Sequence, residues 1–199
     1  MVIPAFIAIM LGLVLGLLDF RPEWLLKITG STDVILFALL FLVGLTLGSG
    51  KGLRMLKGIS KRNLLIVPIG TIVGSLLGGV VCVFITGLPL NISTAIASGM
   101  GWYSLSGITM TDFAGATIGS VTFLANFFRE IISFFSIPVI AKHLNYATAI
   151  APAGATSEDT TLSMIIRHTD EETVAISVFN GMVCSAAVPI LLSFCFYYL

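Results

Sequence analysis

The stretch Thr122-Phe-Leu-Ala-Asn-Phe-Phe-Arg-Glu-Ile-Ile-Ser133 contains an arginine and a glutamate side by side, and positions 113 to 141 hold no other charged residue. An ionisable group at membrane depth costs at least about 2.5 kcal/mol on insertion scales, so a retained one usually has a role. The polar residues of the stretch are spaced four, four and three positions apart and predict one stripe along a helix: Thr122, Asn126, Glu130 and Ser133. We expect this stripe to face the protein interior or a water-filled cavity.

Arg129 and Glu130 are neighbours in the chain, and adjacent helical residues point about 100° apart, which makes a salt bridge between them awkward. We interpret Glu130, and with it Arg129 and Asn126, as candidate substrate- or ion-binding residues. The structural alternative is that the two charges neutralise each other or pair with neighbouring helices.

A second acidic pair interrupts another apolar segment, at Pro152-Ala-Gly-Ala-Thr-Ser-Glu-Asp-Thr-Thr161. Small and hydroxyl residues on both sides of an acid are typical of an unwound stretch inside a transporter, where freed backbone groups bind ions or substrate. The candidates here are Asp159, Glu158, Thr156 and Ser157. The alternative is an ordinary loop, in which Ser157 or Asp159 caps a helix over residues 160–167.

A third polar segment, Ser98-Gly-Met-Gly-Trp-Tyr-Ser-Leu-Ser-Gly107, is dense in glycine and serine and lacks a uniform apolar period. This favours a broken or re-entrant helix over a plain span, with Ser104 and Ser106 as candidate binding residues. Trp102 and Tyr103 fit equally well as interfacial anchors. Two such interruptions separated by one charged helix are a good sequence pointer to a transport site.

The composition agrees with a membrane protein: of 199 residues, 57% are hydrophobic and only 10% charged, whereas a soluble domain is about a quarter charged. The fold class we predict is an all-α polytopic membrane protein embedded in the lipid bilayer. The plain spans are expected at residues 2–18, 34–48, 64–85, 113–141 and 174–199, and the interrupted segments at 92–107 and 147–166. The chain then has five crossings if both interrupted segments are hairpins and seven if both cross.

Charge also sets the expected orientation. Residues 51–62 carry five cations and no acid, so this loop is predicted to be cytoplasmic. The N-terminus is then cytoplasmic, and an odd number of crossings places the C-terminus outside. A turn is expected at residues 87–91. Gly70, Gly74 and Gly78 repeat every four residues, a spacing that favours close helix packing in lipid.

Other classes of function find no support. The net charge is zero, which argues against a nucleic-acid partner. No Gly-x-Ser-x-Gly or His-Glu-x-x-His pattern is present, so we do not expect an enzyme. The three cysteines lack metal-ligand spacing. No cofactor is predicted beyond a coupling ion, H⁺ or Na⁺.

At Gly101-Trp-Tyr-Ser-Leu-Ser-Gly107, Phe128-Arg-Glu130 and Gly154-Ala-Thr-Ser-Glu-Asp159 the chain resembles the LysO-type lysine exporter family, and the resemblance extends over essentially its whole length. It implies export of L-lysine and toxic lysine analogues across the bacterial inner (plasma) membrane. Two intramembrane acids tied to activity in such exporters fall on Glu130 and Asp159. The family is similar to the sodium/proton antiporter and bile-acid symporter group, whose members cross two broken helices in the core.

The chain departs from that pattern in two ways. Typical members carry further helices before the part matched here, and Glu158 occupies a variable position. We therefore expect residues 1–199 to form a single transmembrane transporter domain. A homo-oligomer or a separate small membrane protein would then supply the missing helices. The expected function is antiport of lysine, or another cationic amino acid, against H⁺ or Na⁺. The alternative is a passive channel-like or accessory subunit whose intramembrane acids are structural.

Overall fold

The computed structural model describes residues 61–199 together with residues 11, 14–15 and 41. Contacts divide the chain into two units, Met1–Leu45 and Thr46–Leu199, and every helix described below belongs to the second. The spans predicted at residues 2–18 and 34–48, and the basic loop up to residue 60, lie outside the described residues.

From residue 61 onward the chain is helical, and no strand occurs in this part. The elements are α5 (Lys61–Thr86), α6 (Leu90–Ser98), α7 (Tyr103–Ala114), α8 (Ala116–His143), α9 (Tyr146–Ile150), the 3-10 helix η1 (Gly154–Glu158), α10 (Leu162–His168) and α11 (Glu171–Tyr198). Within the described residues, α5, α8 and α11 are long and apolar enough to cross a membrane. The predicted all-α class is confirmed.

Two glycines with positive φ mark helix ends. Gly87 follows the end of α5 and has a φ of 70°. Because α6 already begins at Leu90, the turn between the two helices is shorter than predicted. The charged helix was expected from residue 113, which is wrong: Gly115, at a φ of 86°, separates α7 from α8 and leaves residues 113–114 in α7. Only glycine adopts this left-handed backbone without strain.

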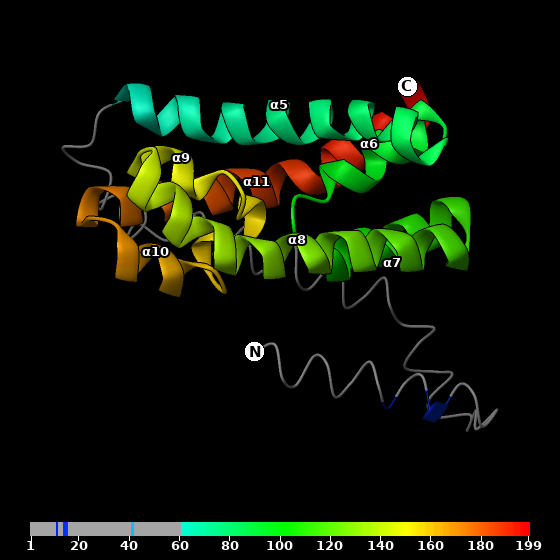
Figure 1. Ribbon diagram of the computed structural model, residues 1–199. Helices are drawn as coiled ribbons and strands as arrows, with labels where there is room; N and C mark the ends of the chain where they lie inside the picture. The colour runs from blue at the N-terminus through cyan, green and yellow to red at the C-terminus, as the bar shows by residue number, and fades with distance from the viewer. Residues whose placement is uncertain (1–10, 12–13, 16–40, 42–60) are drawn as a thin grey trace. The chain divides into compact units, whose positions relative to one another are not determined.

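The first interrupted segment, α6, residues 99–102 and α7, folds back on itself; we name it hairpin 1. Asn91, at the start of α6, donates a hydrogen bond to the Phe196 carbonyl at 3.2 Å. Phe113, at the end of α7, packs on Phe196 and Tyr197 with ring centroids 5.0 and 5.1 Å apart. Both ends of hairpin 1 thus lie beside the C-terminal end of α11 (Figure 1).

The second interrupted segment, α9 to α10, does the same at the opposite end; we name it hairpin 2. One apolar cluster joins Val67 near the start of α5, Ile137 near the end of α8, Ile150 of α9, Ile165 of α10 and Ile176 near the start of α11. Both ends of hairpin 2 therefore lie at the end of the bundle where α11 begins. Figure 1 shows the two hairpins pointing toward each other between the long helices. Each interrupted segment therefore folds back on itself.

Candidate functional site

The polar stripe of α8 is turned inward. Thr122, Asn126, Glu130 and Ser133 are all buried. On the opposite side Phe128 and Phe135 keep 55% and 75% of their surface exposed. The predicted orientation of the stripe is confirmed, because polar groups in an apolar helix avoid the surface that faces hydrocarbon.

The tips of the two hairpins touch. The Ala155 N–H donates a hydrogen bond to the Met100 carbonyl at 2.9 Å. Met100, Gly101 and Gly154 have φ values of 46°, 92° and 60°, all in the left-handed region. A Cβ added to Gly154 would collide with the Met100 carbonyl oxygen, so this approach requires glycine. The interruptions predicted at residues 98–107 and 152–161 therefore meet at one point between the long helices.

Asn126 holds the tip of hairpin 1. Its Oδ1 accepts a hydrogen bond from the Gly101 N–H at 2.8 Å, and its Nδ2 donates to the Ile96 and Thr122 carbonyls, both at 3.0 Å. A broken helix leaves backbone groups without partners, and unpaired groups are costly away from water. Asn126 therefore positions the break, and its side-chain amide is already occupied.

Asn180 of α11 does the same for hairpin 2, and the sequence analysis missed it. Its Nδ2 donates to the Gly154 carbonyl at 3.1 Å and to the Ser157 Oγ at 2.9 Å. The hydroxyls of Ser157 and Ser177 each donate to the other's backbone carbonyl, at 2.9 and 2.8 Å. The signal was available: Ser177, Asn180 and Cys184 are three and four residues apart and form a polar stripe in the uncharged last span.

Most of the predicted hydroxyl candidates also serve the backbone. Ser106 and Thr156 donate to the carbonyls of Trp102 and Ala153, at 2.7 and 2.9 Å. Ser104 is half-buried near the start of α7. The alternative in which Ser157 or Asp159 caps the next helix is wrong, because α10 begins at Leu162 after a Thr161 that makes no side-chain cap bond.

Glu130 is the buried polar group without a partner. It is 2% exposed, and neither carboxylate oxygen has a hydrogen-bond partner among the described residues. The nearby groups that act on this carboxyl include the Thr160 hydroxyl and the Asp159 carboxylate. The Tyr103 ring packs edge-on against Phe123, with ring centroids 5.1 Å apart. A buried, unsatisfied carboxylate in a native fold calls for a ligand, an ion or a proton.

The two acids of hairpin 2 separate at the end of η1. Asp159 is exposed and accepts hydrogen bonds from the N–H and the hydroxyl of Thr160. Glu158 instead faces α11, where its Oε1 accepts from the Ser185 Oγ at 2.8 Å. A Cβ on Gly181 would lie 2.6 Å from the Glu158 Cβ, so the two elements pack closely there. Asp159 therefore belongs with Glu130, and Glu158 does not.

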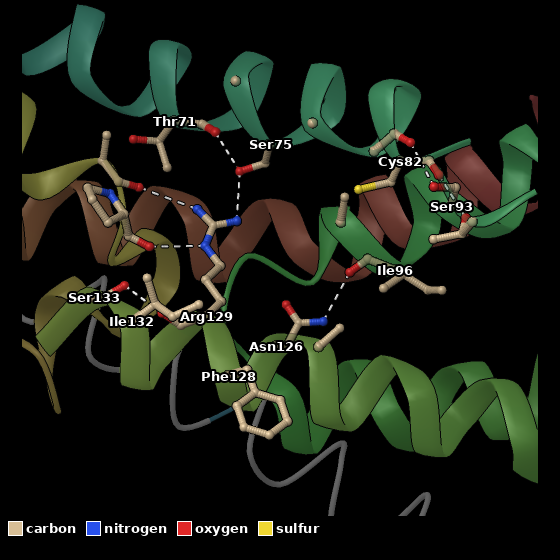
Figure 2. A pocket seen from close by; sticks show the side chains of 18 of the residues that line it. Thr71, Ser75, Cys82, Ser93, Ile96, Asn126, Phe128, Arg129, Ile132 and Ser133 are labelled. Atoms are coloured by element: carbon tan, nitrogen blue, oxygen red, sulfur yellow. Dashed lines mark hydrogen bonds between the residues drawn. The ribbon is translucent and has the colours of Figure 1, made fainter. Parts of the chain in front are cut away.

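Arg129 leaves α8 on another side and does not pair with Glu130. Its Nε donates to the Pro152 carbonyl at 3.0 Å, its Nη1 to the Ser75 Oγ at 2.8 Å and its Nη2 to the Ala151 carbonyl at 3.3 Å. Figure 2 shows the guanidinium reaching from α8 toward α5, while Phe128 points away. The expectation that the neighbouring charges avoid each other is confirmed.

Comparison with known proteins gives a match over nearly the whole chain. The family model described as "Lysine exporter LysO" matches residues 6–196. The chain belongs to the LysO lysine exporter family. It is 37% identical to "Lysine exporter LysO" of Escherichia coli (strain K12) over 186 residues, which cover 94% of this chain and 61% of that protein. It is 36% identical over 193 residues to "Putative lysine exporter" of Haemophilus influenzae, covering 94% of each. No solved structure matches.

The matched family is one of lysine exporters, which are membrane transport proteins and not enzymes. The chain spans about three fifths of the length of the E. coli relative. Within the part of the chain that the structure describes, no three His, Cys, Asp or Glu side chains gather as metal ligands. The chemistry available at the hairpin tips is that of carboxylates, hydroxyls and unwound backbone.

Proposed function

We propose that this chain exports L-lysine, or another cationic amino acid, by exchange with H⁺ or Na⁺. The observation that carries the proposal is the Glu130 carboxyl, which is 2% exposed and has no hydrogen-bond partner in the described residues. Asp159 is the described carboxylate that acts on it electrostatically. The two carboxyls divide ammonium binding and proton carriage between them.

The coupling follows from the cost of a buried charge. An isolated carboxylate away from water is strongly disfavoured unless a cation or a proton neutralises it. A site that exchanges a proton for an ammonium group is neutral in both loaded states, and neither occupant leaves without the other entering. Carrying one positive charge outward against a negative-inside potential costs about 2.3 kcal/mol per 100 mV. Exchange for one incoming cation cancels this cost, and exchange for two reverses it.

The arrangement of the hairpins supports alternating access. Their tips meet between the long helices, so a small relative motion of the bundle opens the acids to one end or the other. With both hairpins re-entrant, the whole chain has five crossings, a cytoplasmic N-terminus and an external C-terminus in the bacterial inner membrane. A C-terminal reporter that is active only in the cytoplasm should stay silent, and a strong signal would contradict this topology.

Labelled lysine efflux from vesicles tests the role of Glu130. We compare the wild-type chain with Glu130→Gln and with Glu172→Gln, an exposed glutamate at the start of α11 that serves as the matched control. Glu130→Gln should lose proton-coupled efflux, whereas Glu172→Gln should keep it. Proton-coupled efflux at the normal rate in Glu130→Gln would refute the assignment.

The same vesicles separate an exporter from a passive pore. A carrier shows saturation and counterflow, in which unlabelled lysine on one side drives uptake of labelled lysine, and a pore shows neither. The measurement is repeated with a co-expressed small membrane protein from the neighbouring reading frame, where one exists. Counterflow that appears only with this protein would make the chain one part of a two-part exporter.

A further inference from the structure

A groove of about 720 Å³ lies between α5 and α8, on the side of the hairpin contact that Arg129 faces. Its lining comes from α5, α6, α8 and the end of α9, and Figure 2 shows Arg129 and Asn126 at its floor. A volume of this size is in the range of small-molecule sites. Nothing in the family match assigns a ligand to this groove.

The wall contributed by α5 is smooth. A Cβ added at Gly70, Gly74 or Gly78 would meet nothing within 4 Å, so no described helix packs on this stripe. The close packing predicted for these three glycines is not seen in the described part. It occurs one residue further on, at Gly79, where an added Cβ would lie 2.9 Å from the Cβ of Ala97 on α6. The glycine stripe therefore widens the groove.

Arg129 is the one charged side chain in the lining formed by the described residues. The groove hydroxyls of Thr71 and Ser93 are already bonded, to the Val67 carbonyl at 2.9 Å and the Gly79 carbonyl at 2.7 Å. The guanidinium is therefore the charged group in this lining that can recognise an anion entering the groove.

The guanidinium has donors to spare. It carries five N–H groups, and the three protein acceptors that it meets take one from each nitrogen. One N–H on each Nη therefore has no acceptor among the described residues. Two N–H groups on the terminal nitrogens of an arginine are the fork that binds a carboxylate in bidentate fashion.

The positive charge is also unbalanced within the described part, where no carboxylate forms a salt bridge with Arg129. The carbonyls of Ala151 and Pro152, after the end of α9, supply only partial negative charge. A guanidinium held in an apolar groove with two open donors gains most from an anion.

We propose that Arg129 binds the α-carboxylate of the transported amino acid in this groove. The inference rests on the proposed function and extends it to the substrate's acidic end. Arg129 and Glu130 leave α8 in different directions, one toward the groove and one toward Asp159.

Binding to the purified full chain tests this, with two probes that differ in one group. Lysine has the carboxylate, and cadaverine is the same carbon chain with two ammonium groups and no carboxylate. Competition against labelled lysine should show wild type preferring lysine over cadaverine by at least about 10-fold, which corresponds to 1.4 kcal/mol. Arg129→Gln should remove this preference, because it lowers the affinity for lysine and leaves the affinity for cadaverine unchanged. Arg129→Lys, which keeps the charge without the fork, should fall between them.

Each other outcome overturns the inference. If wild type binds lysine and cadaverine equally well, the carboxylate is not recognised and the inference fails, whereas the proposal of lysine export still stands. If Arg129→Gln loses the same affinity for lysine and for cadaverine, Arg129 only holds hairpin 2 in place. Displacement of bound lysine by phosphatidylglycerol micelles, together with equal binding of lysine and cadaverine, would assign the groove to a lipid headgroup. Wild type that binds neither probe and shows no lysine flux removes the proposed function as well.

Discussion

Replacing Gly154 by alanine tests the contact on which the whole arrangement of hairpins depends. Gly154 sits at the tip of hairpin 2 with a φ of 60°, and an added Cβ would meet the Met100 carbonyl oxygen of hairpin 1. That oxygen accepts the Ala155 N–H at 2.9 Å, so the new methyl group and the hydrogen bond compete for the same space.

The expected loss follows from two contributions. The left-handed conformation costs a residue with a Cβ about 1–2 kcal/mol. Loss of the hydrogen bond between Ala155 and Met100 removes about 0.5–1.5 kcal/mol more. Together they lower the free energy of unfolding by about 1.5–3.5 kcal/mol, which corresponds to a melting temperature lower by roughly 3–14 °C for a chain of this length.

Thermal unfolding of the purified protein in detergent measures this directly, with Gly70→Ala as the matched control. Gly70 lies inside α5, and an added Cβ there meets nothing within 4 Å. Alanine in a helix interior is favoured over glycine by about 0.5–1 kcal/mol, so the control should melt at or slightly above the wild-type temperature. If Gly154→Ala melts within about 2 °C of wild type, less than 1 kcal/mol has been lost and the two tips do not meet as described.

Asp159→Asn should abolish resistance to a toxic lysine analogue, because the Asp159 carboxylate acts on Glu130. Glu158→Gln should keep most of the resistance and mainly shift the pH dependence of export, because a glutamine oxygen still accepts a hydrogen bond from Ser185. Exchanged outcomes would show that the family's second acid has been matched to the wrong residue. At the start of α11, hydrogen bonds from Thr173 hold the pKa of the Asp170 carboxyl below its usual value. The charged cap therefore adds stability above the ordinary value of about 3.9, and this stability is lost as pH falls through the lowered folded value. Wild type should melt at a higher temperature than Asp170→Asn at pH 7, and this difference should shrink as the pH is lowered below the ordinary value of about 3.9. A difference that does not change with pH would contradict the assignment.

The helix that carries the charges was predictable because its polar residues obey one period. Thr122, Asn126, Glu130 and Ser133 recur at helical spacing, and a polar stripe in an apolar helix has one favourable direction, which is inward. The predicted starting residue of this helix was wrong. The run of apolar residues continues through Gly115, and only the positive φ of Gly115 shows that the helix begins after it.

The partners that hold the hairpin tips were harder to predict. Asn180 and Ser177 lie in a span without any charge, where polar residues of this size are also compatible with simple packing. Their role depends on the carbonyl of Gly154 and the backbone of Ser157 lying beside α11. That proximity is a tertiary fact, since the residues involved are 20 and 26 positions apart.

Sequence by itself determined the class of protein, the inward face of α8, the two breaks and the family, because composition, helical period and local motifs are properties of short segments. The tertiary structure decided that each broken segment folds back on itself, since a Gly/Ser-rich run has the same composition whether it turns back or runs straight on, and only its contacts with α11 distinguish the two. It also decided that Glu130 is buried without a partner among the described residues, while Arg129 faces the groove and Glu158 bonds to Ser185. Neighbouring side chains leave a helix about 100° apart, and what each one meets depends on which element packs on that side.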